Sequence, residues 1–259
     1  MATDITPSSP FDPSHVAVVT GAARGIGLGI ATQLARQGLT VALLDRDAAA
    51  LDGAIGALSA QGCNVFGASA DLTDSAAVNE AFARVQARAG RVDYLVNNAG
   101  AVRDMRFLKM SEADWDLVID TNLRSQFLCC RAALPGMVER GHGRVVNISS
   151  RAWLGGFGQA NYSAAKGGVV SLTRSLAIEF ASKGITVNAV APGIVDTPLF
   201  RGFAPDVQAR LRQSVPVHRI GTADDIANAV AFFLDPRSSY VTGQVLYVCG
   251  GRSLSSPSV

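Results

Sequence analysis

Short apolar runs alternate with longer amphipathic stretches along nearly the whole chain. Seven apolar runs predict buried strands, over residues 15–20, 40–44, 64–68, 92–96, 143–148, 185–190 and 244–248. Helical periodicity fills segments between them: from Gly27 to Gly38, and over 75–89, 113–138, 159–182 and 223–234. Continuous apolar strands that alternate with helices are typical of a parallel sheet covered on both faces. We therefore expect an α/β fold with a doubly wound, seven-stranded parallel sheet.

Polar or turn-forming residues occur at or just past the ends of these strands. They are Thr20, Asp45, Asp71, Asn97, Ser150 and Pro192. In open α/β sheets, ligands bind in the crevice beyond the carboxyl ends of the strands. The pattern therefore predicts one shared site at that edge of the sheet.

The composition favours a single domain. A chain of 259 residues with 48% hydrophobic content is long enough to bury a large core. No Pro/Ser-rich linker, charge block or internal repeat divides it, so we expect one domain over residues 13–252. The flanking segments 1–12 and 253–259 are polar and rich in Pro and Ser, which predicts disordered tails.

Charge and cysteine usage exclude several classes of function. A net charge of +2 gives no electrostatic footprint for nucleic acid. The N-terminus has no apolar signal segment and no apolar run approaches membrane-spanning length, so we expect a cytoplasmic protein that does not bind membranes. The four cysteines and three histidines show no metal-ligand spacing, which predicts chemistry without a metal ion.

A glycine-rich turn follows the first predicted strand and opens a helix. Gly21, Gly25 and Gly27 are spaced Gly-x-x-x-Gly-x-Gly, a variant of the commoner Gly-x-Gly-x-x-Gly. Such glycines permit a tight turn, close approach of a pyrophosphate and close packing of helix on sheet. The free N–H groups of the helix N-terminus then face the phosphates. The context predicts a dinucleotide site.

Tyr162 and Lys166 stand four residues apart in a predicted helix, which places both side chains on one face. A phenol titrates near pH 10 and is a poor base alone. A neighbouring cation favours the phenolate, so we expect Lys166 to lower the pKa of Tyr162. The pair is then a plausible proton donor and acceptor for a carbonyl/alcohol couple.

Six motifs occur in a fixed order: T-G-A-A-R-G-I-G from Thr20, N-N-A-G from Asn97, Asn122, the Ser149-Ser150 pair, Tyr162 with Lys166, and Pro192-Gly193. In this order the chain resembles the short-chain dehydrogenase/reductase family, from about His15 to Gly251. The resemblance implies a single-domain Rossmann fold and hydride transfer between a nicotinamide dinucleotide and a secondary alcohol or ketone. Around residues 103–123 the chain is similar to the 3-oxoacyl-[acyl-carrier-protein] reductase branch.

The resemblance also implies roles for a catalytic set of Asn122, Ser150, Tyr162 and Lys166. Tyr162 would exchange the proton with the substrate oxygen, and Lys166 would hold the nicotinamide ribose. A serine hydroxyl would bond the substrate oxygen, and Asn122 would position a water. Counting from the strand 143–148 selects Ser150, whereas counting back thirteen residues from Tyr162 selects Ser149. Because strands hold register and loops absorb deletions, we prefer Ser150.

The choice of cofactor depends on Asp45 at the end of the second predicted strand. A carboxylate there accepts hydrogen bonds from a ribose with free hydroxyls and repels a 2′-phosphate. Arg24 and Arg46 favour the opposite choice, because each could pair with that phosphate. We expect NAD, with NADP as the alternative. The expected cofactor-binding residues are Gly21, Arg24, Gly25, Ile26, Gly27, Asp45, Arg46, Asp71, Leu72, Asn98, Ala99, Gly100, Tyr162, Lys166, Pro192, Gly193, Val195 and Thr197.

The substrate is less specified by the sequence. Residues 197–217 resemble the family's substrate lid, and the expected substrate-binding residues are Ser150, Trp153, Tyr162 and Phe200. The leading hypothesis is an NAD(H)-dependent oxidoreductase of a small secondary alcohol or ketone. The alternatives are a 3-oxoacyl-thioester reductase using NADPH and a non-catalytic nucleotide-binding scaffold. Family likeness further implies a homotetramer built from the helices 113–138 and 159–182 and the last strand.

Overall fold

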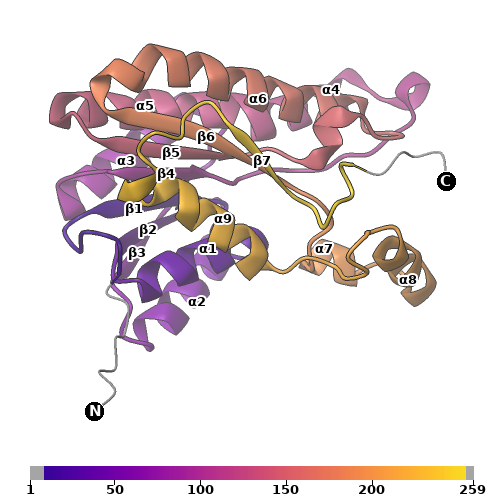
Figure 1. Ribbon diagram of the computed structural model, residues 1–259, viewed down its shortest axis with the longest axis horizontal. Helices are drawn as coiled ribbons and strands as arrows, with labels where there is room; N and C mark the ends of the chain where they lie inside the picture. Colours follow the sequence, from indigo (N-terminus) through magenta and orange to yellow (C-terminus); the bar gives the residue numbers. More distant parts are fainter. Residues whose placement is uncertain (1–8, 255–259) are drawn as a thin grey trace.

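The computed structural model describes residues 9–254. One sheet holds all seven strands in the order β3-β2-β1-β4-β5-β6-β7, and every neighbouring pair is parallel (Figure 1). The strands are β1 Val16–Thr20, β2 Thr40–Asp45, β3 Val65–Ser69, β4 Tyr94–Asn97, β5 Gly143–Ile148, β6 Ile185–Pro192 and β7 Val245–Val248. The predicted α/β fold and seven-stranded sheet are confirmed.

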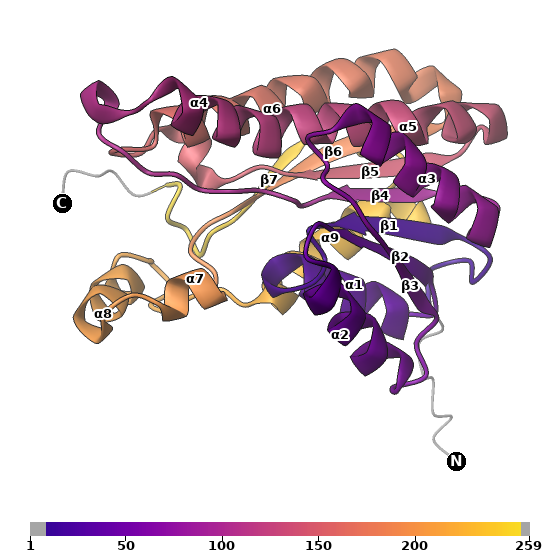
Figure 2. The same ribbon diagram turned by 180° about the vertical axis from the view of Figure 1, so that it is seen from behind.

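Helices cover both faces of the sheet (Figures 1 and 2). They are α1 Gly25–Arg36, α2 Ala48–Ser59, α3 Ser75–Ala89, α4 Glu112–Ile119, α5 Ser125–Arg140, α6 Ala160–Phe180, α7 Pro198–Arg201, α8 Pro205–Gln213 and α9 Ala223–Leu234. Helices α1, α2 and α9 pack on one face and α3, α5 and α6 on the other. Within residues 9–254, no helix is long and apolar enough to cross a membrane.

The inner strands are mostly apolar because both of their faces are buried. In β1, Ala17 and Val19 belong to the core beneath α1 and α9, whereas Val16 and Val18 belong to the core beneath α3 and α5. Side chains of a strand alternate between its faces, so a strand between two helical layers favours apolar residues on both faces. This is why the apolar runs located the strands.

The strand order reverses direction at β1. From β1 the chain moves outward to β2 and β3, and then returns to pair β4 on the other side of β1. Loops that leave β1 and β4 therefore diverge to opposite faces and leave a crevice at their carboxyl ends. Helices α7 and α8 lie beyond this edge, apart from the sheet (Figure 1).

The helix expected over residues 113–138 is confirmed, since α4, a π-helical turn Asp120–Arg124 and α5 follow one another without a gap. The π-helical turn within it was not expected, and helix α2 was not among the helical segments named from the sequence. Phe11, inside the predicted tail 1–12, is buried against Tyr94, so the packed chain begins before residue 13. Residues 1–8 and 255–259 of the predicted tails lie outside the described residues.

Candidate active site

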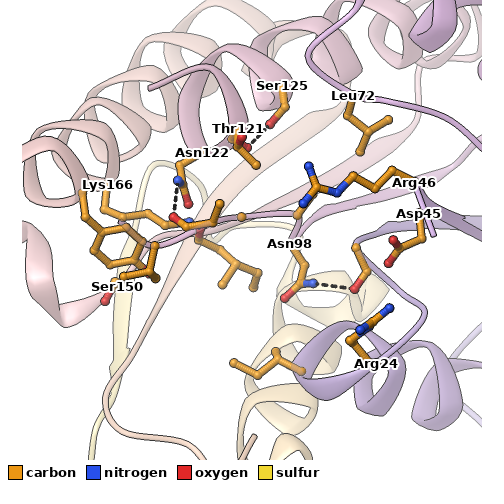
Figure 3. Close-up of a pocket in the computed structure, with 18 of the residues that line it drawn as sticks. Arg24, Asp45, Arg46, Leu72, Asn98, Thr121, Asn122, Ser125, Ser150 and Lys166 are labelled. Carbon is orange, nitrogen blue, oxygen red and sulfur yellow. Dashed lines mark hydrogen bonds between the residues drawn. The ribbon is translucent and has the colours of Figure 1, made fainter. Parts of the chain in front are cut away.

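A cavity of about 560 Å³ opens at the carboxyl ends of the central strands (Figure 3). Most of the expected cofactor and catalytic residues line it. They are Gly21, Arg24, Ile26, Asp45, Arg46, Asp71, Leu72, Asn98, Ala99, Gly100, Asn122, Ser150, Tyr162, Lys166, Pro192, Gly193 and Thr197. Residues from loops, helices and strand ends that are far apart in the chain thus meet in one site, as the motif positions predict.

The glycine-rich turn forms one wall of the cavity. Gly21 has a φ of +61°, and a Cβ there would lie 2.8 Å from the Cα of Ala99. A Cβ on Gly27 would lie 2.1 Å from the carbonyl oxygen of Gly21. Any side chain at either position would push the turn apart, so glycine is required. Gly25 and Gly27 shape this turn without lining the cavity.

Asn98 and Thr20 fix the turn to β4. The Asn98 side chain donates to the carbonyl oxygens of Thr20 and Gly21, at 3.0 and 3.1 Å. The Thr20 hydroxyl accepts from the backbone N–H groups of Asn98 and Ala99, at 2.9 and 3.0 Å. The carbonyls and hydroxyl inside the turn are therefore satisfied within the protein, and the turn is held rigid before any ligand arrives.

The carboxylate of Asp45 is also fixed in place. One oxygen accepts from the backbone N–H of Ala23 and the other from that of Asp47, each at 3.1 Å. Arg24 forms an ion pair with Asp47, which partly neutralises it. Arg46 has no such partner among the described residues, and Figure 3 shows its guanidinium group directed into the cavity.

Asp71 and Leu72 form the far rim. The Asp71 carboxylate accepts from the backbone N–H and the hydroxyl of Thr73, at 2.9 and 2.8 Å, and these bonds lower its pKa. The helix that follows is capped by Asp74, whose side chain accepts from Ala77 N–H at 2.8 Å. Asp71 therefore both shapes a turn and lines the cavity, and Asp74 is the helix cap.

Asn122 lies in the π-helical turn between α4 and α5. Its side-chain amide donates to the carbonyl oxygens of Ala101 and Val118, at 2.8 and 2.9 Å. Its Oδ1 atom is buried and has no hydrogen-bond partner among the described residues. A buried acceptor without a partner is costly, and π-helical turns often occur at functional sites. Asn122 thus presents an unused acceptor in the cavity wall.

Lys166 is fully buried, and its ammonium donates to the carbonyl oxygen of Ile148 at 2.9 Å. Burial lowers the pKa of Lys166 from 10.5 to about 7. The Nζ atom lies 5.6 Å from the centroid of the Tyr162 ring. The lysine and the tyrosine thus share one helix face, as their spacing predicts.

Burial raises the pKa of Tyr162, and a hydrogen bond with Ser150 opposes this rise. The expectation that Lys166 lowers the tyrosine pKa is wrong for this structure. The ammonium is bonded to a backbone carbonyl and faces the ring instead of the hydroxyl, so desolvation of the phenol dominates. Tyr162 is therefore held as the protonated phenol, the form that donates a proton.

The cavity has the features that a dinucleotide requires. The turn at Gly21 and Gly27 admits no side chain, and the N-terminus of α1 carries no acidic residue in its first turn. Asp45 offers a fixed carboxylate near the turn, and the buried oxygen of Asn122 has an unfilled acceptor position. The residues present therefore fit a nicotinamide dinucleotide, from Asp71 at one end to Lys166 at the other.

Besides Gly25 and Gly27, three expected site residues do not line this cavity. Trp153 stacks on Tyr247 of β7, with 6.4 Å between ring centroids. Phe200 is buried and packs edge-on against Phe203. Val195 is buried and forms an isolated bridge to Gly221. The apolar character of these residues is used for packing, which the sequence could not distinguish from a pocket wall.

Several cavity residues were not expected. They are Asp47, Ala70, Thr73, Ala101, Val102, Thr121, Ser125 and Ile148. Thr121 and Ser125 come from the π-helical turn and the start of α5, and the Ser125 hydroxyl donates to the Thr121 carbonyl at 2.6 Å (Figure 3). In the sequence, the interruption of the apolar pattern at Thr121-Asn122 was the one sign that residues 121–125 face a cavity.

Comparison with known proteins supports the same assignment. A family profile described as Enoyl-(Acyl carrier protein) reductase matches residues 21–253. The (2S)-[(R)-hydroxy(phenyl)methyl]succinyl-CoA dehydrogenase subunit BbsD of Thauera aromatica is 49% identical over 241 residues, which cover 93% of this chain and 97% of that protein. The 3-oxoacyl-[acyl-carrier-protein] reductase FabG of Escherichia coli is 42% identical over 240 residues, covering 91% and 96%.

A solved structure agrees closely in fold. The crystal structure of a putative gluconate dehydrogenase from Agrobacterium tumefaciens has a TM-score of 0.90 and 34% sequence identity, and the match covers 93% of this chain and 97% of that one. Fold, cavity and relatives therefore converge, and the chain belongs to the short-chain dehydrogenase/reductase family of oxidoreductases.

Proposed function

We propose that this protein transfers a hydride reversibly between NAD(H) and the carbon of a secondary alcohol or ketone, with Tyr162 as general acid and base. One observation carries the proposal. Ser150 and Lys166 lie on one side of the cavity and Arg24 and Asp45 on the other (Figure 3), and Tyr162 and Gly21 line the same cavity. A nucleotide bound along the cavity would bring its reactive ring to the side chains of Ser150, Tyr162 and Lys166.

Bound nicotinamide would supply the hydride for reduction of a carbonyl carbon, or accept one from an alcohol. The chain supplies the proton. In reduction, the Tyr162 hydroxyl donates its proton to the carbonyl oxygen as negative charge develops there. The Ser150 hydroxyl donates a hydrogen bond to the same oxygen. Lys166 would bond the nicotinamide ribose, and in the alcohol direction Tyr162 takes the proton back.

NAD is the proposed cofactor because Asp45 is fixed at the turn and Arg24 is already paired with Asp47. A 2′-phosphate would meet the Asp45 carboxylate and would have to compete for Arg24. Exposed ion pairs contribute little, so Arg46 alone offers weak compensation. The expected cofactor residues that line the cavity would hold the nucleotide.

The second candidate is a 3-oxoacyl-thioester reductase that uses NADPH. Its support is the orientation of Arg46 into the cavity together with the names of two relatives, which describe thioester substrates. A non-catalytic scaffold is the third. It is disfavoured because Asn122, Ser150, Tyr162 and Lys166 are all present at the cavity.

The deciding experiment measures kcat/KM for NADH and NADPH with an acetoacetyl thioester and with a simple ketone. The proposal expects NADH preference and turnover of the ketone at least equal to that of the thioester. NADPH preference with faster thioester turnover would select the second candidate. Absence of turnover with every pair, alongside tight NADH binding, would select the scaffold.

We also propose a homotetramer in the cytoplasm. Large apolar side chains are exposed on each of the elements expected to form the interfaces: Phe127 on α5, Ile178 on α6 and Leu246 on β7. An interface formed by these elements would remove these three side chains from water. All four cysteines carry free thiols, in keeping with a reducing compartment. Light scattering on the purified protein would measure the assembly, and a monomer would contradict it.

A further inference from the structure

One hydrogen bond joins two walls of the cavity. The Nη1 atom of Arg124 donates to the backbone carbonyl oxygen of Thr73 at 2.6 Å, across 51 positions of the chain. Thr73 lies in the turn between β3 and α3, and Arg124 is the last residue of the π-helical turn before α5. Within residues 9–254, this is the hydrogen bond that connects residues 70–74 with residues 120–126.

Both walls contribute residues to the cavity. Three come from the turn after β3 and three from the segment around Arg124: Asp71, Leu72, Thr73, Thr121, Asn122 and Ser125. Arg124 itself is exposed and does not line the cavity. Any effect of this side chain on a bound nucleotide is therefore transmitted through Thr73.

The turn 71–73 lies at the end of the cavity away from the expected catalytic residues. In Figure 3, Leu72 and Asp45 lie on the side opposite Ser150 and Lys166. In the proposed function, the nicotinamide lies beside Lys166. The adenosine half of the dinucleotide then lies against Asp45 and the turn 71–73, so Arg124 holds the adenosine end of the site.

The other hydrogen bonds of this turn are local or hold its start. The Asp71 carboxylate accepts from the N–H and hydroxyl of Thr73, and its carbonyl oxygen accepts from the N–H of Asp74 at 3.2 Å. The N–H of Ala70 donates to the carbonyl oxygen of Asp45 at 3.0 Å. These bonds shape the turn and tie its start to β2, whereas Arg124 holds its outer edge against the opposite wall. A segment already held in its bound shape does not have to be ordered during binding, so its ligand binds more tightly.

We propose that Arg124 is a positioning residue for the adenosine half of the nucleotide, because its bond to Thr73 holds the turn 71–73 in place before the nucleotide binds. The inference rests on the proposed function, which sets the direction of the nucleotide in the cavity. Arg124 belongs to no motif of the sequence and was not among the expected cofactor-binding residues. Since the role concerns one half of the nucleotide, probes that contain different halves test it.

Calorimetric titration without substrate measures the Kd of three probes: NADH, ADP-ribose and reduced nicotinamide mononucleotide. Arg124→Met keeps most of the length of the side chain and removes the donor. We expect it to raise the Kd for NADH and for ADP-ribose about 3- to 10-fold, the range that one ordinary hydrogen bond supports. The Kd for the mononucleotide should stay unchanged. Arg124→Lys, which keeps the charge and a donor on a shorter side chain, should give values between those of wild type and Arg124→Met.

Arg84→Met is the matched control. Arg84 is also exposed, lies on α3, and donates from its Nη2 atom to the backbone carbonyl oxygen of Ser69 at 3.0 Å. Ser69 does not line the cavity. The control therefore removes the same kind of bond at a carbonyl just outside the site, and it should bind all three probes as wild type does.

An unchanged Kd for NADH in Arg124→Met would overturn the proposal. An equal rise for all three probes would also overturn it, because every probe carries phosphate and would respond alike to a lost charge or to a damaged fold. The same rise in Arg84→Met would do so too. Binding needs no turnover, so the expected pattern without reduction of any ketone would support the role of Arg124 while the proposed hydride transfer fails. Normal turnover with unchanged NADH binding would remove the role of Arg124 alone.

Discussion

The hydroxyl of Ser149 donates to the backbone carbonyl of Lys166 at 2.9 Å, inside the core between β5 and α6. This bond ties the end of β5 to the helix that carries the tyrosine. It also engages the hydroxyl proton of Ser149 in a bond to the backbone. Ser150, one residue later, is the serine that bonds Tyr162. The two serines therefore have different surroundings, which supports the proposal of Ser150 as the catalytic serine.

We expect Ser150→Ala to lower kcat by about 10²-fold or more, because it removes a donor aimed at the developing oxyanion. Ser149→Ala should lower the free energy of unfolding by about 1 kcal/mol, the usual contribution of one buried hydrogen bond, with a small effect on kcat. Steady-state kinetics and urea denaturation of both variants measure this. A larger loss of kcat in Ser149→Ala would reverse the assignment.

Tyr162→Phe should abolish nearly all turnover while NADH still binds. The substitution removes the hydroxyl that donates the proton and keeps the ring that packs beside Lys166. General acid catalysis contributes roughly 10²–10⁴-fold. The measurement pairs stopped-flow kinetics with fluorescence titration of NADH. Turnover within a few-fold of wild type would show that another group donates the proton.

Asp45→Asn should weaken the preference for NADH over NADPH by about 30-fold, since hydrogen bonds to a charged acceptor contribute roughly 2 kcal/mol. The amide keeps the size of the side chain and one acceptor for the turn, but it no longer repels a phosphate. The ratio of kcat/KM for the two cofactors measures the change.

Asp47→Asn is the informative companion variant. It releases Arg24 from its ion pair and leaves Asp45 in place. We expect kcat/KM for NADPH to rise a few-fold, with that for NADH unchanged. If neither variant alters the ratio, cofactor choice does not depend on this side of the cavity.

Lys166 should make the stability of the protein depend on pH. Its pKa falls from 10.5 in the unfolded chain to about 7 in the folded one, so between these values the unfolded chain binds the extra proton. Stability therefore rises with pH across this window, and the full penalty is present below pH 7. Each pH unit corresponds to about 1.4 kcal/mol, so Lys166→Met should be more stable than wild type by roughly 3–5 kcal/mol at pH 6.

Urea denaturation of both proteins without nucleotide, at pH 6, 8 and 10, checks this. The difference should shrink as the pH approaches 10.5. A constant difference over the range would show that Lys166 keeps its ordinary pKa when folded. In that case Lys166→Met would gain no stability from removal of the buried charge.

The fold was predictable because a two-sided core leaves a strong signal. Every residue of β5 and β6 is buried, and apolar residues predominate in both strands despite the buried polar positions Arg144, Asn147, Thr186 and Asn188. Helix α2 was not predicted from the sequence, because it consists mostly of Ala, Gly and Leu and has a weak apolar stripe. The π-helical turn between α4 and α5 was not predicted, because the interruption of the apolar pattern at Thr121-Asn122 does not reveal that one residue is inserted into a continuous helix.

The positions of the motif residues at the cavity were predictable because strand ends converge at one edge of a parallel sheet. The contacts that these side chains make with one another could not be predicted from the sequence. Whether Lys166 would face the Tyr162 ring or its hydroxyl depends on the Ile148 carbonyl, 18 positions away in the sequence. Trp153 and Phe200 likewise contact partners that no spacing rule identifies. Sequence patterns locate such residues, and packing decides what they touch.

The hydrogen bonds between Thr20 and Asn98 join residues 78 positions apart in the chain. When β1, the glycine turn and α1 have left the ribosome, Asn98 has not yet been released, so the turn lacks the hydrogen bonds that hold it in place. The turn becomes rigid only when β4 emerges and pairs with β1, long after β2 and β3 have left the exit tunnel. The nascent chain therefore cannot form its nucleotide site until β4 has paired with β1.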